Sequence, residues 1–300
     1  MSTFDEILKS AVNNVANNNS YQNNVYNKEE WAKNKREQRE WAYKTQDDMA
    51  KKVAENSEVL RKYLNIQTIF ESKSVGNAML ITAQNPKATE LRDAKGWKEN
   101  NIYLKRNPKK IIILEPVEYI REDGETGKTY NPVELIDISE TQAKRLTNDI
   151  SYKLEEILPS ILSLARVKVE TLPDGESNID EKVVSFNQET KTIQIDSTAD
   201  PSDIIKGLVC EIASIEMNTL SKTPIDNFKN NCVTYLICNK YGMSVQDIDL
   251  SIPEELKQME AQNIKEVFGQ AVECFQRLKV GIDRTMDRNE NTRSNRDYER

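Results

Sequence analysis

Apolar positions are unevenly spread along the first 70 residues. Residues 13–27 are rich in asparagine and hold too few apolar side chains to offset the entropy lost on ordering, so we expect a disordered lead over 1–27. From 28 to about 70 the chain contains no proline or glycine and favours helix. Apolar residues recur there at helical spacing, which predicts one stripe along a long N-terminal helix. The stripe consists of Met49, Val53, Leu60 and Leu64.

A mixed region follows. Residues 75–84 predict a short apolar helix, closed by Asn85-Pro86 because proline disfavours helical backbone in the residue before it. Further predicted elements are strands at 110–120 and 133–138, with Asp123-Gly124 as the turn between them, and a helix at 149–164 that Pro159 should end or kink.

The second half predicts strands first and helices afterwards. The predicted strands are 166–171, 182–187 and 191–196, the last two forming a hairpin across 188–190. The predicted helices are 203–218, with Asp200 or Asp203 as its N-cap, then 224–242, and finally 253–280. The charged residues 283–300 predict a disordered tail. The whole pattern predicts an α+β fold of two small domains preceded by a long helix.

Composition narrows the class of protein. Of the 300 residues 37% are apolar and 30% charged, and the mean hydropathy is −0.70. No apolar run is long enough to span a bilayer, and the first residues lack the hydrophobic region of a signal peptide, so we expect a cytosolic (cytoplasmic) protein without membrane contact. The cysteines have no CxxC spacing, which argues against a disulfide framework or a zinc knuckle.

Charge is distributed asymmetrically. The net charge is −7, but residues 61–114 contain eleven Lys or Arg and four Asp or Glu, so this basic window carries +7 and the remainder −14. Eight cationic and aromatic residues lie close together within it. They are Lys95, Trp97, Lys98, Tyr103, Lys105, Arg106, Lys109 and Lys110. Cations that follow phosphates and aromatic rings that stack on bases are what single-stranded nucleic acid requires. A solvated surface with Trp97 and Tyr103 in a core is the alternative.

The chain contains no histidine, which rules out Ser-His and Cys-His dyads and imidazole metal ligands. In residues 204–217 the spacing still matches a zinc-peptidase helix, in which two His one turn apart bind the metal and the Glu after the first is the general base. Those positions hold Cys210, Glu211 and Ser214. The glutamate of the general base is kept, whereas the two histidine ligands are replaced by cysteine and serine.

Residues 61–142 carry a resemblance to a known family. Asn77 precedes an apolar helix that ends in Gln84-Asn85-Pro86, Trp97 and a basic stretch follow, and 113–116 reads Ile-Leu-Glu-Pro. In this order the motifs resemble the N-terminal domain of ArdC-type antirestriction proteins, in particular the LtrC-like group of conjugative elements. The resemblance implies a single-stranded DNA-binding domain followed by a zincin-like metallopeptidase domain. It also places a third metal ligand at Asn231, so all three ligand positions depart from the family pattern.

These observations lead to one hypothesis and two alternatives. We expect a non-catalytic, single-stranded DNA-binding accessory protein of a mobile element, with a degenerate zincin-like domain and neither metal nor cofactor. The alternatives are a module that binds a host or element protein through the degenerate cleft and the N-terminal helix with Trp31 and Trp41, and an active zinc peptidase. The expected segments are a lead (1–27), a helical extension (28–60), an ArdC N-terminal-like domain (61–143), a connecting helix (144–165), a degenerate zincin-like domain (166–282) and a tail (283–300).

Overall fold

The computed structural model describes residues 28–121, 124–143, 152, 154–173 and 182–298. The predicted disordered lead lies outside these residues, as does the stretch 144–151 of the predicted connecting helix. The helices are α2 (Lys28–Glu55), α3 (Ser57–Ile69), α4 (Val75–Gln84), α5 (Ala94–Glu99), α6 (Leu154–Leu162), α7 (Pro201–Glu216), α8 (Pro224–Lys240), α9 (Glu254–Gln258) and α10 (Ala261–Tyr298). The strands are β1 (Leu91–Arg92), β2 (Lys110–Ile120), β3 (Thr126–Asp137), β4 (Lys168–Thr171), β5 (Val184–Asn187) and β6 (Thr192–Ile195).

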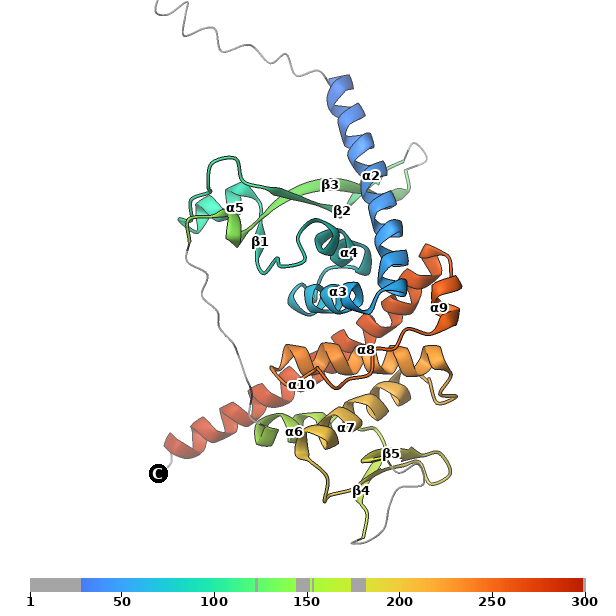
Figure 1. Cartoon of the computed structure of the whole chain (residues 1–300). Coiled ribbons are helices and arrows are strands. Elements are labelled where there is room, and N and C mark those ends of the chain that lie inside the picture. Colours follow the sequence, from blue (N-terminus) through green and yellow to red (C-terminus); the bar gives the residue numbers. More distant parts are fainter. Residues whose placement is uncertain (1–27, 122–123, 144–151, 153, 174–181, 299–300) are drawn as a thin grey trace, which may run out of the picture.

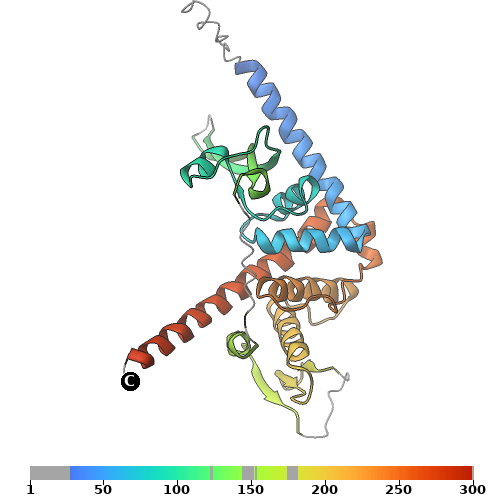
Figure 2. The same ribbon diagram turned by 60° about the vertical axis from the view of Figure 1, so that its left-hand side comes forward.

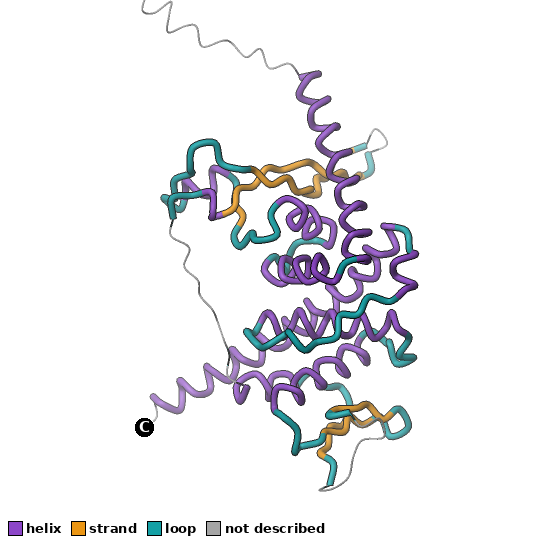
Figure 3. The backbone as a smooth tube through the Cα atoms, viewed as in Figure 1, coloured by secondary structure: helices purple, strands orange, loops and turns teal. Residues whose placement is uncertain are grey.

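The predicted α+β class is confirmed, with two small sheets at opposite ends of a stack of helices (Figures 1 and 3). The first sheet has the strand order β1-β3-β2 and the second β4-β6-β5. Between them lie α4 and α3, then α8 and α10, which cross the middle of the molecule, and then α7 and α6 (Figure 1). A single cluster of buried apolar side chains reaches from α2 to the second sheet. The two predicted domains therefore share one core, and the domain division stays a prediction.

The predicted N-terminal helix is two helices. Asn56 has an extended backbone (φ −133°, ψ 113°), and its side chain accepts hydrogen bonds from the N–H groups of Glu58 (2.9 Å) and Val59 (3.1 Å). An N-cap of this kind satisfies the first donors of α3 and so favours a new start over a continuous helix. The predicted apolar stripe is buried as expected, but it is shared between α2 and α3.

The hairpin of the first sheet is longer than predicted. β2 coincides with the predicted strand, but β3 begins at Thr126 instead of 133, because the ladder continues to the pair Ile120↔Thr126. Gly124, whose N–H donates to the carbonyl of Arg121 (3.0 Å), has a φ of +84°, which glycine adopts without steric cost. Pro132 is tolerated within β3 because it lies opposite Leu114, whose N–H and C=O point away from β3.

Two side-chain amides of α4 cover the exposed edge of β2. Asn77 donates to the carbonyl of Leu114 (2.8 Å) and accepts from its N–H (2.9 Å). Gln84, two turns later, makes the same pair of hydrogen bonds with Ile112, at 2.8 Å and 2.9 Å. Because β2 is an edge strand, these amides pair backbone groups that would otherwise be open to another strand. We call Asn77 and Gln84 the amide clamp.

The second sheet contains the predicted hairpin of β5 and β6, and β4 joins it parallel to β6. Helix α7 lies close against β5 because Gly207 leaves room for Val184, whose side-chain carbons are 2.8 Å from where a Cβ would be. Asp200 provides the N-cap of α7. Pro159 does not end α6, which continues to Leu162.

The C-terminal elements correct two predictions. The predicted helix 253–280 is divided into α9 and α10, and α10 then runs to Tyr298 instead of giving way to a disordered tail at 283. Its apolar face ends near Ile282, but the sequence beyond contains neither proline nor glycine, so nothing interrupts helical backbone. The last turns leave the body of the protein (Figure 2).

Polar contacts join the parts on either side of the predicted domain boundary. Glu71, after α3, forms ion pairs with Lys240 of α8 (2.7 Å) and Lys279 of α10 (2.8 Å). Burial alone would raise the pKa of Glu71, but the two ammonium groups outweigh it and lower the pKa. In the described part of the chain, no helix is both long and apolar enough to cross a membrane.

Candidate functional site

The predicted peptidase positions lie on α7 and α8, and the structure brings two of them together. The thiol of Cys210 donates a hydrogen bond to Oδ1 of Asn231, with 3.8 Å between sulfur and oxygen. The amide nitrogen of Asn231 in turn donates to the carbonyl of Asp249 (2.9 Å). The positions that the resemblance assigns to the first and third ligands are therefore neighbours across the two helices.

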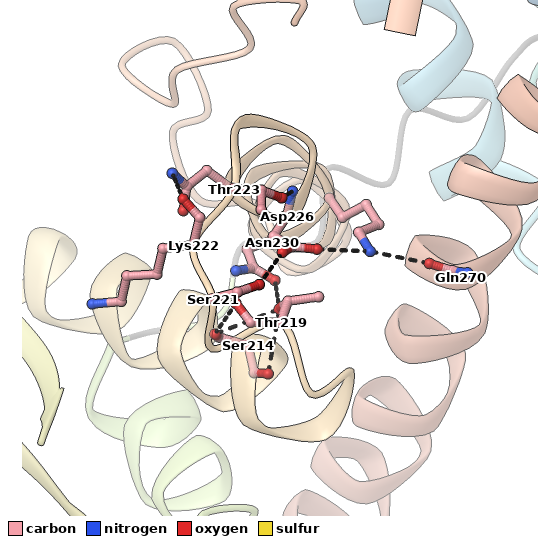
Figure 4. Close-up of polar contacts among 10 residues, drawn as sticks. Ser214, Thr219, Ser221, Lys222, Thr223, Asp226, Asn230 and Gln270 are labelled. Carbon is pink, nitrogen blue, oxygen red and sulfur yellow. Dashed lines mark hydrogen bonds and ion pairs between the residues drawn. The ribbon is translucent and has the colours of Figure 1, made fainter. Parts of the chain in front are cut away.

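Ser214, at the second ligand position, is engaged elsewhere. Its hydroxyl donates to the carbonyl of Thr219 (3.3 Å), and the hydroxyl of Thr219 donates to Oδ1 of Asn230 (2.8 Å) (Figure 4). All three side chains are buried. These bonds close the loop between α7 and α8, so Ser214 has a structural role in this arrangement.

The network around this loop continues to α10. Ser221 donates to Asp226 (2.7 Å), Asp226 pairs with Lys229 (3.0 Å), and Lys229 donates to Gln270 (3.1 Å) (Figure 4). Burial acts to raise the pKa of Asp226, but these donors together with Thr223 lower it. Sequence reasoning missed this network. The available signal was the Thr-Pro pair at 223–224, which begins α8 with Thr223 as its N-cap.

The thiol of Cys210 is protonated at neutral pH in this structure. Burial, and then the nearby charge of the buried Glu211, raise the pKa of this thiol to about 11. A metal that bound it would first have to displace this proton, because a thiol binds zinc as the thiolate. The other cysteines are free, buried thiols whose pKa values burial also raises, to about 12 for Cys238 and Cys274.

The residues at these positions do not fit zinc. The donors at the three ligand positions are a protonated thiol, a hydroxyl and an amide, whereas zinc sites use thiolate, imidazole and carboxylate. Among the described residues, no group of three or more cysteines and carboxylates is placed to hold a metal ion. Glu211 therefore has no polarised water to activate through a metal at this site, and we derive no hydrolytic step from it.

The predicted nucleic-acid residues lie on α5 and on the loop between α5 and β2, at the end of the first sheet away from its hairpin turn (Figure 1). Tyr103 is 72% exposed. Its backbone is fixed, because its carbonyl accepts from the N–H of Gln142 (2.8 Å) and the next residue, Leu104, is bridged to Thr141. An exposed ring on a fixed backbone is suited to stacking, since little freedom is lost on binding.

Trp97 is not part of this surface, which corrects the prediction that it stacks on bases. Its side chain is 0% exposed, and its indole nitrogen donates to the carbonyl of Ile136 (2.9 Å). The guanidinium of Arg92 lies over its ring, 5.4 Å from the centroid. The structure thus supports the alternative, in which Trp97 is a buried residue packed against β1 and β3.

The predicted cations are all exposed but differ in their partners. Lys110 pairs with Glu134 (2.6 Å) and Lys95 with Glu99 (3.6 Å). Lys105 and Lys109 donate to backbone carbonyls, those of Ser139 (2.5 Å) and Gln84 (3.2 Å). Within the described ranges, Lys98 and Arg106 make neither an ion pair nor a side-chain hydrogen bond. We call Lys98, Tyr103 and Arg106 the basic surface.

Comparisons with known proteins give few matches. No family model matches this chain, and no curated protein is similar to it. Among solved structures, the antirestriction protein ArdC from plasmid R388 matches in its metal-free form with a TM-score of 0.44 and 10% identity over 70% of this chain and 85% of that one. Its Mn(II)-bound form matches with a TM-score of 0.45 and 8% identity, over 70% of this chain and 84% of that one. A likeness this weak assigns neither a site nor an activity.

Proposed function

We propose that this chain is a non-catalytic protein that binds single-stranded DNA through the basic surface. The observation that carries the proposal is the exposed ring of Tyr103 on a fixed backbone, in the same short segment as Lys98 and Arg106, which have no ionic partner among the described residues. Phosphates supply the attraction to the cations, and a base supplies the stacking partner for the ring. The stacking requires an unpaired base, which favours a single strand over a duplex.

The proposed biological setting is a mobile genetic element. It rests on the ordered motifs shared with the ArdC and LtrC-like family over residues 61–142. In this setting the degenerate zincin-like part, with Cys210 next to Asn231 and Ser214 in the loop network, is a scaffold. The third function considered, zinc-dependent proteolysis, is disfavoured by the donor set at those positions.

Replacing Tyr103 with alanine tests the stacking role. Loss of one stacked base corresponds to about 1–3 kcal/mol, so we expect affinity for a labelled 20-mer single strand to fall by about 5- to 150-fold. Fluorescence anisotropy on the full chain measures this. Tyr119→Ala is the matched control, because Tyr119 is also exposed but lies on the distal part of the hairpin. Equal affinities for the two variants, or tighter binding to a duplex of the same sequence, would overturn the proposal.

A second function, recruitment of a protein partner, is favoured by one observation. Trp31 and Trp41 on α2 are 49% and 42% exposed, although large aromatic side chains are usually more deeply buried. Aromatic side chains are enriched at protein interfaces. The oligonucleotide titration separates the two functions, since a pure interaction module would show no salt-sensitive binding at micromolar protein.

A further inference from the structure

A cleft of about 800 Å³ lies where α2, the start of α4, the first hairpin and α10 meet, and its lining includes neither the basic surface nor Cys210, Ser214 and Asn231. Its walls come from Tyr43 and Gln46 of α2, residues 74–77, Tyr130 of β3 and the first half of α10. Figure 1 shows these elements converging beside the hairpin. The volume is within the range of about 300–1,000 Å³ that is typical of small-molecule sites.

Gln46 is the first sign of a ligand. Its side chain is only 7% exposed, yet among the described residues its amide has no hydrogen-bond partner. The amide lies flat on Gly76, with its atoms 2.8–2.9 Å from where a Cβ of that residue would be. Buried side-chain amides are normally hydrogen-bonded, and Gln46 can both donate and accept at once. A group that fits it must offer an acceptor and a donor side by side.

Two tyrosines provide the second sign. Tyr43 lies three residues before Gln46, so both project from the same face of α2 into the cleft. Tyr130 faces the cleft from β3. The two side chains are 42% and 45% exposed, which leaves ring surface open to a flat ligand.

Charge indicates what kind of flat ligand fits. The ionic side chains of the cleft already have partners: Lys265 pairs with Asp47 (2.7 Å), Glu273 with Arg277 (2.7 Å), and Glu266 accepts from Gln262 (3.2 Å). Lys265 and Glu273 are neutralised by their ion pairs, while Glu266, held by an amide, keeps its negative charge, so the cleft favours a neutral, polar ring over an anionic ligand. The N–H groups of the first turn of α4 add further donors.

We propose that this cleft binds a nucleobase, with Gln46 hydrogen-bonded to the base edge and the rings of Tyr43 and Tyr130 against its faces. Every base presents a donor next to an acceptor on its pairing edge, and amide side chains recognise such edges in pairs of hydrogen bonds. The proposal does not rest on single-stranded DNA binding at the basic surface, because the two sites share no residue. The base comes from a free nucleoside or from a strand.

Adenosine and cytidine are the probes for the first source, measured by saturation-transfer NMR and calorimetry on the full chain, with ribose as the sugar control. We expect nucleosides but not ribose to bind. Gln46→Met, which keeps the length of the side chain and removes its hydrogen bonds, and Tyr43→Ala should each weaken binding by at least about fivefold. Tyr119→Ala should leave it unchanged. Tyr43 is half exposed, so its variant stays informative if Gln46→Met fails to fold.

A 12-mer and an abasic strand of the same length test the second source. If the base comes from a strand, Gln46→Met weakens binding of the 12-mer at least about fivefold and leaves the abasic strand unaffected. The double variant Lys98→Gln, Arg106→Gln, which removes only phosphate contacts, would weaken both strands alike, so failure of either proposal is recognisable. The proposal is overturned if neither nucleosides nor the 12-mer respond to the cleft variants, or if inorganic phosphate binds there in place of nucleosides.

Discussion

Replacing Trp97 with alanine should lower the free energy of unfolding by about 3–5 kcal/mol, the usual loss for a fully buried tryptophan. The side chain is completely buried, it donates to the carbonyl of Ile136, and Arg92 lies over its ring. Its removal leaves a cavity against β3 and removes the indole hydrogen bond to the carbonyl of Ile136. Urea denaturation followed by circular dichroism measures the change.

Trp41→Ala is the matched control, because Trp41 is 42% exposed and loses much less burial on truncation. We expect it to cost less than about 1.5 kcal/mol. Trp97→Phe should fold and keep its affinity for single-stranded DNA, since the ring does not reach the surface. If Trp97→Ala were as stable as Trp41→Ala and bound DNA more weakly than the wild type, Trp97 would be a stacking residue after all.

Replacing Asn77 with alanine should cost about 2–4 kcal/mol, because it leaves both the N–H and the C=O of Leu114 without partners in a buried position. Gln84→Ala removes the equivalent pair at Ile112, where the site is only partly buried, so its cost should be smaller. The same denaturation experiment measures both variants. With the edge of β2 open, the Asn77 variant should also aggregate more readily on warming.

Asn100→Ala serves as the control for the amide clamp. Asn100 also donates a side-chain hydrogen bond to a backbone carbonyl, that of Gly96 (2.8 Å), but it does so in solvent on the surface. Its loss should be within about 0.5 kcal/mol. An Asn77→Ala variant no less stable than Asn100→Ala would show that the edge of β2 does not depend on the clamp.

The sequence predicts an element accurately where the signals that start and end it lie within a few neighbouring residues. The helix α4 coincides with its prediction because Ser74 caps it and Asn85-Pro86 ends it within the same short stretch. The break at Asn56 was missed because the helical spacing continues across it, and only the side-chain hydrogen bonds of that residue reveal a cap. The extent of α10 was missed because low apolar content predicts disorder, although helical backbone continues there.

The candidate sites depend on residues that are distant in the sequence, and for these the sequence predicts less. The resemblance, and not the spacing within 204–217, implied that Cys210 and Asn231 belong to one site, and the structure places the two side chains in contact across α7 and α8. The burial of Trp97 was not predictable, because a six-residue helix has too little periodicity to show which side faces a core. The cleft was missed because Tyr43, Gln46 and Tyr130 become neighbours only when α2 packs across the hairpin.

The salt dependence of single-strand binding tests the central claim most directly. Each phosphate contact on a single strand contributes about 0.7 to the slope of log affinity against log salt, so the double variant Lys98→Gln, Arg106→Gln should have a slope shallower than wild type by about 1.4. Lys128→Gln, on the distal hairpin, should leave the slope unchanged. A slope that is the same in the double variant and the wild type, or no salt-sensitive binding by the wild type, would contradict a DNA-binding role for the basic surface.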